Sequence, residues 1–160
     1  MTTTLRASPD TCAWGYFAAT LAPVTEVQSS AVITIETVSG GPEELPPEKQ
    51  GFYVPPELLD IHARSERQLP GHILTGPVAV QGTKPGDVLE VQILDVTCRQ
   101  DWGWNLIRPL AGTLPYDFQQ ARTEIIPMDL DTRTARLSWG LELPLSPFFG
   151  VMGVAPPANW

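Results

Sequence analysis

Prolines and glycines punctuate this chain so densely that little room is left for long helices. The sequence holds 17 Pro and 13 Gly among 160 residues, without low-complexity repetition. Proline lacks the backbone N–H and fixes φ, which ends helices, whereas glycine adopts turn conformations that other residues reach only at a cost. This density favours short strands joined by turns over a helical bundle.

Alternating apolar and polar residues predict where the strands lie. The expected strands span residues 31–38, 78–80, 88–96 and 133–142. In residues 88–96, Leu89, Val91 and Ile93 share one face, and a Pro-Gly-Asp turn at 85–87 comes just before them. Such turns are favoured because Pro presets φ and Gly accepts positive φ. One short helix is expected at 55–64, because two prolines can begin its first turn.

The predicted fold class is therefore mostly β: a β-sandwich with Pro/Gly-rich loops and at most one short helix. At 17.5 kDa the chain is long enough for one domain with a core of its own. No linker interrupts the pattern, so residues 1–160 are expected to form a single domain.

Composition excludes several classes of function. The chain has 18 acidic and 10 basic residues, and no cluster of Lys or Arg, which argues against a nucleic-acid partner. No apolar run approaches the roughly 20 residues of a membrane span, and the first residues do not resemble a secretion signal. We expect a cytoplasmic protein.

The sequence lacks the motifs of several other enzyme classes. It contains no GxSxG elbow of serine hydrolases, no HExxH motif of metalloproteases, and no motif of P-loop or dinucleotide-binding proteins.

Two residues are the main candidates for chemistry. His72 lies just before an apolar pair and a Thr-Gly-Pro turn, where it could bind a metal or act as a base, or be a hydrogen-bonded structural residue. Asp101 precedes Trp102 and Trp104, whose rings could desolvate its carboxylate and raise its pKa. The alternative is a capped loop whose two tryptophans fill the core.

Other polar residues are interpreted as structural. His62, on the expected helix, is a packing or surface residue. Asp129 and Asp131, followed by Thr132, resemble a short acidic turn. A calcium loop needs a longer series of ligands than these two carboxylates provide, so a turn is favoured.

Four segments resemble one protein family when taken in order. They are HILTGP (72–77), PGDVLEV (85–91), DWGWN (101–105) and PFFGVMGVAPP (147–157). Their order and approximate spacing resemble the N-terminal half of the acetamidase/formamidase family of amide hydrolases, from about residue 23 to the last residue. Each segment alone is a weak signal, but the ordered set is specific.

This resemblance implies a β-sandwich and a function. The substrate would be formamide, acetamide or a similar small amide, hydrolysed with release of ammonia and with help from zinc or another divalent metal. The catalytic candidates are His72, which is also the candidate metal ligand, and Asp101; Thr75, Trp102 and Trp104 are the candidates for binding substrate. A hairpin over residues 78–96, closed near the Pro85-Gly86 turn, is expected to bring His72 and Asp101 to one pocket.

The resemblance covers only half of such an enzyme. Members of this family are about twice as long, and their second half carries a GGN-D and a GDGHAAQGDGE-like segment that this chain lacks. The chain is then half of a split enzyme, a piece of a longer protein, or a stand-alone domain that binds without catalysis. We favour an amidase that needs a C-terminal half or partner chain. The alternative is a non-catalytic binding or assembly domain, and the apolar run 147–154 predicts association in either case.

Overall fold

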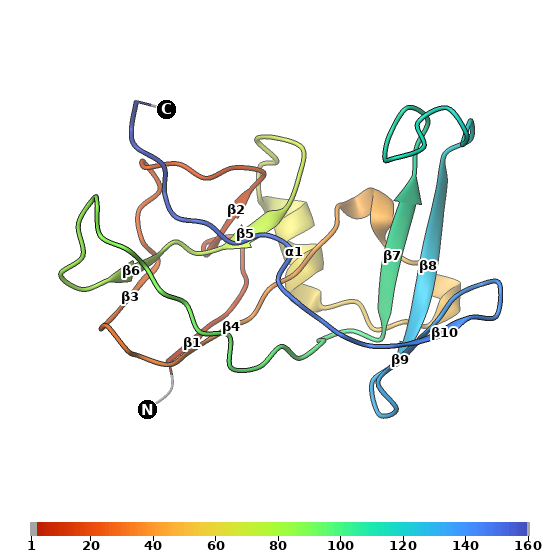
Figure 1. Ribbon diagram of the computed structural model, residues 1–160, viewed down its shortest axis with the longest axis horizontal. Helices are drawn as coiled ribbons and strands as arrows, with labels where there is room; N and C mark the ends of the chain where they lie inside the picture. The colour runs from red at the N-terminus through yellow and green to blue at the C-terminus, as the bar shows by residue number, and fades with distance from the viewer. Residues whose placement is uncertain (1–2, 160) are drawn as a thin grey trace. The chain divides into compact units, whose positions relative to one another are not determined.

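The computed structural model describes residues 3–159, which cluster into two compact units (Figure 1). The first unit comprises residues 3–41, Pro55–Asp95 and residues 149–159. The second unit comprises Pro42–Val54 and Val96–Phe148. Each unit is therefore assembled from segments that are far apart in the sequence.

The first unit contains three sheets of two strands each. Their pairs are β1 (Thr3–Leu5) parallel to β4 (Ile33–Ile35), β2 (Cys12–Trp14) antiparallel to β5 (Ile73–Thr75), and β3 (Thr25–Val27) parallel to β6 (Val78–Val80). Every strand pairs with one that is distant in sequence. Such short strands obtain their stability from long-range contacts rather than from local hairpins.

The helix α1 (Pro56–Arg64) supplies the centre of the first unit's core. It begins after Pro55, where the missing N–H of Pro56 leaves no helical hydrogen bond unmade. Leu58 and Ile61 are both 0% exposed, whereas Leu59 on the other face is 47% exposed. The helix predicted at 55–64 is confirmed, and its spacing of apolar residues buries one stripe.

His62 is a packing residue, which is one of the two interpretations that its sequence position allows. Its ring stacks on Trp14 with centroids 5.5 Å apart, and its Nε2 lies 3.0 Å from the carbonyl oxygen of Gly40. Arg67 covers the same indole, with its guanidinium carbon 5.4 Å from the ring centroid. These contacts join α1 to β2 and help to bury Trp14, which is 4% exposed.

The second unit is built on a four-stranded antiparallel sheet. Its strands, in the order β10-β9-β8-β7, are β10 (Glu142–Pro144), β9 (Thr134–Arg136), β8 (Arg122–Asp129) and β7 (Trp102–Ile107). Two short 3-10 helices, η1 (Pro42–Glu44) and η2 (Glu48–Gln50), belong to the same unit. Trp102 is its most buried large side chain, at 1% exposure.

The strand predicted at 88–96 is wrong. These residues form no ladder with any described residue, and residues 88–95 are exposed. An alternating sequence becomes a strand only where a second strand satisfies its backbone groups, and the described residues provide none. The expected hairpin over 78–96 is wrong for the same reason, because β6 pairs with β3 instead.

Three further predictions need correction. The strand expected at 133–142 is a hairpin of β9 and β10, because a turn closes with the Gly140 N–H donating to the Leu137 carbonyl and Gly140 at a φ of 90°. The capped loop that the alternative interpretation places at DWGWN is instead mostly strand, since β7 begins at Trp102. The strand expected at 31–38 shrinks to Ile33–Ile35.

The fold class is confirmed: the described residues are mostly β with a single α-helix. The expectation of one domain over residues 1–160 concerns both units together and stays a prediction. No helix among residues 3–159 is long and apolar enough to cross a membrane.

Truncating the buried face of α1 tests whether this helix holds the first unit. We expect Leu58→Ala to lower the free energy of unfolding by about 2–5 kcal/mol, because it opens a cavity where no side-chain surface is exposed. Leu59→Ala, on the exposed face, should change it by less than about 1 kcal/mol. Urea denaturation followed by tryptophan fluorescence measures both, and equal losses would contradict the assignment of faces.

Gly15 offers a second test, because its backbone has a φ of 96° and a Cβ there would overlap the Leu69 carbonyl. Gly51 has a φ of 71° but open space around it, so Gly51→Ala adds only backbone strain of about 1 kcal/mol. We expect Gly15→Ala to cost at least about 2 kcal/mol more than Gly51→Ala, since its clash is with backbone. Thermal unfolding of the two variants measures both losses of stability. Equal losses would show that the backbone around Leu69 moves to accommodate the new Cβ.

Candidate functional site

His72 is held at the start of β5 by its backbone rather than by its side chain. Its carbonyl oxygen accepts a hydrogen bond from the Gly15 N–H at 2.9 Å, which extends the β2–β5 pairing by one step. The residue itself is exposed. The scaffold therefore fixes the backbone of His72 and leaves its side chain accessible to a ligand or to a proton.

Thr75 uses its hydroxyl within the first unit. Its Oγ1 donates to the carbonyl of Glu36 at 3.1 Å and lies 3.5 Å from the sulfur of Cys12. The single hydroxyl proton is thus committed to the scaffold, and the oxygen keeps a lone pair that can accept from an amide N–H. The predicted contact of Thr75 with substrate stays a prediction, restricted to the role of acceptor.

Asp101 and Trp102 together bind both backbone polar groups of Tyr53. The Asp101 Oδ1 accepts from the Tyr53 N–H at 3.0 Å, and the Trp102 Nε1 donates to the Tyr53 carbonyl at 2.8 Å. The Asp101 carbonyl also accepts from the Met128 N–H at 2.7 Å, which joins it to β8. We call this arrangement the Tyr53 clamp. It ties the segment 42–54 to the edge strand of the sheet.

The clamp clarifies the two interpretations of Asp101. One carboxylate oxygen has a structural task, and Trp102 is buried as the core interpretation expects. The Oδ2 atom makes no hydrogen bond within residues 3–159, so a carboxylate oxygen is left for a ligand. Trp104 follows two positions along β7, on the same face as Trp102, and is only partly buried.

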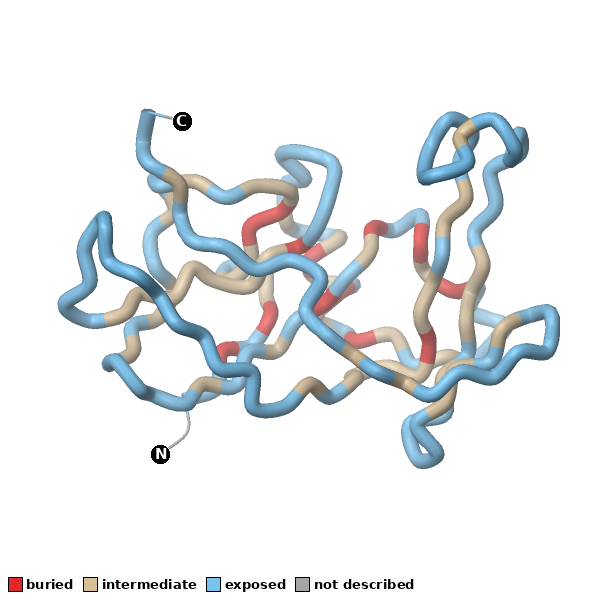
Figure 2. The backbone as a smooth tube through the Cα atoms, in the orientation of Figure 1, coloured by how far each residue is buried: buried red, intermediate tan, exposed pale blue. Residues whose placement is uncertain are grey.

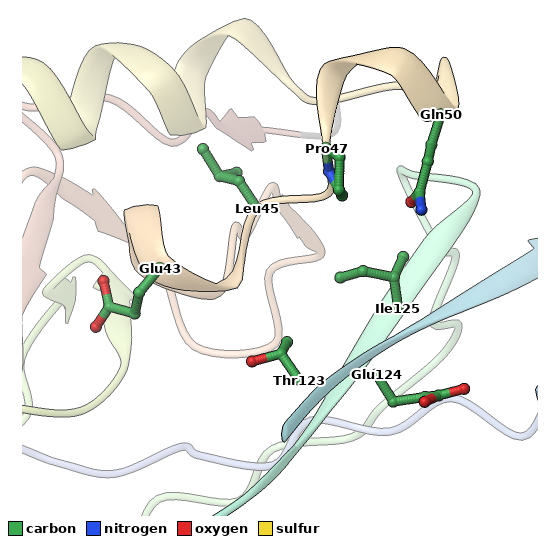
Figure 3. A pocket seen from close by; sticks show the side chains of 7 residues that line it. All are labelled: Glu43, Leu45, Pro47, Gln50, Thr123, Glu124 and Ile125. Atoms are coloured by element: carbon green, nitrogen blue, oxygen red, sulfur yellow. The ribbon is translucent and has the colours of Figure 1, made fainter. Parts of the chain in front are cut away.

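A shallow groove lies elsewhere in the second unit (Figure 3). Its volume is about 380 Å³, and its lining residues are Glu43, Leu45, Pro47, Gln50, Thr123, Glu124 and Ile125. Thr123 and Ile125 point from β8 toward the segment that carries η1 and η2. None of the predicted site residues lines this groove. The sequence missed it because β8 itself was not predicted.

Glu124 is held in its charged form, and its side chain lies on the other face of β8 from Thr123 and Ile125 (Figure 3). A hydrogen bond from Ser138 lowers the pKa of its carboxyl, and the Arg122 guanidinium, 2.5 Å away, lowers it further against an opposing effect of burial. Because this charge is paired with Arg122 and points away from the groove, it does not select a ligand there.

The acidic turn at Asp129 is confirmed. Its Oδ1 accepts from the N–H groups of Asp131 and Thr132, both at 2.9 Å, and these bonds lower the pKa of its carboxyl. The carboxylate therefore caps its own turn, as short Asx turns do. This arrangement uses the acceptor that a calcium ion would need.

The metal suggested by the resemblance does not fit the described residues by themselves. No group of three or more His, Cys, Asp or Glu residues within 3–159 is placed to hold an ion. A catalytic zinc normally has three protein ligands and one open position. His72 could be one ligand, and a site with three protein ligands would need at least one from outside the part of the chain that the structure describes.

The predicted site residues fall into two groups. His72 and Thr75 belong to the first unit, and Asp101, Trp102 and Trp104 to the second, where the Tyr53 clamp joins the first two of these. The expected hairpin that was to bring His72 to Asp101 is absent from the described residues. Their meeting in one pocket is a statement about both units and stays a prediction.

Two comparisons with known proteins find the same family. Residues 60–160 match the profile of the acetamidase/formamidase family. A crystal structure of an acetamidase from Bacillus halodurans superposes on 95% of this chain with a TM-score of 0.71 and 26% sequence identity. A search of curated protein sequences found no match.

The length of the two proteins differs. The superposed region is only 46% of the acetamidase chain, so this chain spans about half the length of the solved structure it resembles. The matched profile begins within α1 and includes His72, Thr75 and the Tyr53 clamp's Asp101 and Trp102. The chain belongs to the acetamidase/formamidase family.

Proposed function

We propose that this chain forms one part of a hydrolase that cleaves formamide, acetamide or a similar small amide and releases ammonia. The observation that carries the proposal is the match of residues 60–160 to the acetamidase/formamidase family. The superposition on an acetamidase supports it. Because that acetamidase is about twice as long, we propose that activity needs a second segment, equivalent to the uncovered part of the acetamidase and present as a C-terminal half or a partner chain.

The chemistry of amide hydrolysis gives the chain's residues defined tasks. The reaction needs an activated water and a group that protonates the leaving ammonia. The exposed imidazole of His72 can carry that proton, and the unbonded Oδ2 of Asp101 can orient the imidazole or accept a proton. Thr75 can accept from the substrate's N–H, and Trp104 can form a wall that excludes water.

We propose that zinc or another divalent metal binds only when the second segment supplies further ligands. The described residues do not complete a metal site, so no catalytic step follows from His72 and a metal alone. We propose that His72 supplies one ligand and the second segment the others. A metal held in this way would supply an activated water.

A second candidate function is a binding or assembly domain without catalysis. Two observations favour it: the Thr75 hydroxyl donates to Glu36, and the Asp101 Oδ1 accepts from Tyr53, so both groups have structural tasks. For either function we propose a cytoplasmic location, and association with the second segment or with further copies, but not with nucleic acid or a membrane. The acidic composition supports the exclusion of nucleic acid.

Ammonia release distinguishes the two functions. The purified chain should show no hydrolysis of formamide or acetamide, with or without added zinc, because the described residues do not complete a metal site. Addition of the second segment, expressed as the part of the acetamidase that this chain does not cover, should produce turnover. Robust turnover by the chain alone would contradict the need for a second segment, and no turnover by the mixture would favour the binding domain.

Substitution of Asp101 separates its structural task from a catalytic one. Asp101→Asn keeps an oxygen for the Tyr53 N–H, so the free energy of unfolding should change by less than about 1 kcal/mol. It removes the carboxylate, so kcat of the assembled enzyme should fall by about 100-fold or more if Asp101 moves or orients a proton.

Asp101→Ala is the matched control, because it also removes the Tyr53 contact and should destabilise the chain by about 1–3 kcal/mol. If Asp101→Asn retains full kcat, Asp101 is a structural residue only. Urea denaturation and ammonia release on the same preparations give both quantities.

A further inference from the structure

A seven-residue segment of the first unit, residues 88–94, exposes apolar side chains along its whole length. The exposed fractions are 95% for Val88, 52% for Leu89, 49% for Val91, 49% for Ile93 and 71% for Leu94. The tube in Figure 2 is coloured as exposed throughout this segment. A run of this kind is unusual at a protein surface, where apolar side chains are normally scattered.

The backbone of the same segment has no partner. Within residues 3–159, no backbone hydrogen bond involves residues 88–94. The segment follows the turn at 84–87, which the Asp87 N–H closes onto the Lys84 carbonyl, and it then runs without regular structure (Figure 1). Unpaired N–H and C=O groups in a row are a template for a further strand.

The side chains of this segment already follow the pattern of a strand. Glu90 and Gln92, two positions apart, are joined by a hydrogen bond of 3.0 Å and so share one face. Leu89, Val91 and Ile93 then share the opposite face, which is wholly apolar. Residues 88–94 contain no proline or lysine, which proteins commonly place on an edge strand to prevent pairing.

The occupant that fits this segment is a strand from the second segment. The acetamidase that superposes on 95% of this chain contains about as much chain again, because the superposed region is 46% of its length. That additional chain is available to cover a surface which this chain leaves open. A segment that pairs along residues 88–94 would satisfy the backbone and bury the apolar face at the same time.

A second copy of this chain fits less well. Antiparallel pairing of two such segments about Val91 would set Asp87 of each copy opposite Asp95 of the other. Like charges that face each other across a strand pair are destabilising. The formal net charge of −8 on each copy opposes association further.

We propose that residues 88–94 form an edge strand on which the second segment docks by adding a strand of its own. This proposal rests on the proposed function, which requires such a segment. It also accounts for the alternating sequence of 88–96, which has the pattern of a strand although residues 88–94 pair with no strand among residues 3–159. The exposed apolar residues at 151–154, in the same unit, offer further surface for the same occupant.

Hydrogen–deuterium exchange of the chain with and without the second segment tests the docking mode. The probe is the uncovered part of the Bacillus halodurans acetamidase, added in excess to the full chain. Amides of residues 88–94 should exchange freely in the chain alone and at least about tenfold more slowly in the complex, because strand pairing protects them. A complex in which these amides remain unprotected would overturn the proposal, and so would the absence of any complex.

A pair of matched variants gives the second readout. Val91→Lys, at a side chain 49% exposed, should weaken binding of the probe about tenfold or more, because a charge replaces an apolar contact. Leu114→Lys, at a side chain 55% exposed in the second unit, should bind like the parent chain. Equal binding of the two variants would overturn the proposal.

Ammonia release from the same mixtures separates this proposal from the proposed function. Protection of residues 88–94 without turnover supports the docking strand and contradicts the amidase. Turnover without protection supports the amidase and overturns the docking strand. Protection of 88–94 in the chain alone, appearing with dimers in sedimentation, would identify a second copy as the occupant and overturn the proposal.

Discussion

Strand pairing over long distances in the sequence is the constraint on which the rest of this structure depends. In the first unit each strand has three residues and a partner far along the chain, and β2 with β5 carries His72 at its end. None of these three strand pairs is expected to form without the others, because pairs of such short strands gain little stability by themselves. Residues 88–94 show the reverse case: the same alternating pattern, with no partner strand among residues 3–159, remains exposed.

The Tyr53 clamp has the corresponding role in the second unit. A buried indole and a carboxylate bind both backbone groups of Tyr53, so two hydrogen bonds of 3.0 and 2.8 Å tie segment 42–54 to the start of β7. An aspartate in this position serves stability first, and any chemistry must use its remaining oxygen. The proposed catalytic task of Asp101 would therefore have to coexist with this structural task, which is why a substitution that keeps the oxygen is informative.

The parts that could be predicted from the sequence are those with local causes. Two prolines and an amphipathic stripe predicted α1, and the turn at Asp129 follows from side-chain bonds to its own backbone. The strand β8 was missed because Pro127 disfavours a ladder; the structure tolerates it because β9 reaches only Met128 and Asp129. The groove beside β8 was missed with it. Whether His72 and Asp101 share a pocket depends on both units, which local patterns do not describe.

The central claim is that this chain is half of a working amidase, and a titration tests it most directly. Ammonia release from formamide or acetamide is measured at a fixed concentration of the chain while the second segment is added. The account predicts no turnover at the start, a rise in rate, and a plateau when the two polypeptides are equimolar. A rate that is already maximal without the second segment, or that stays at zero beyond equimolar addition, would contradict it.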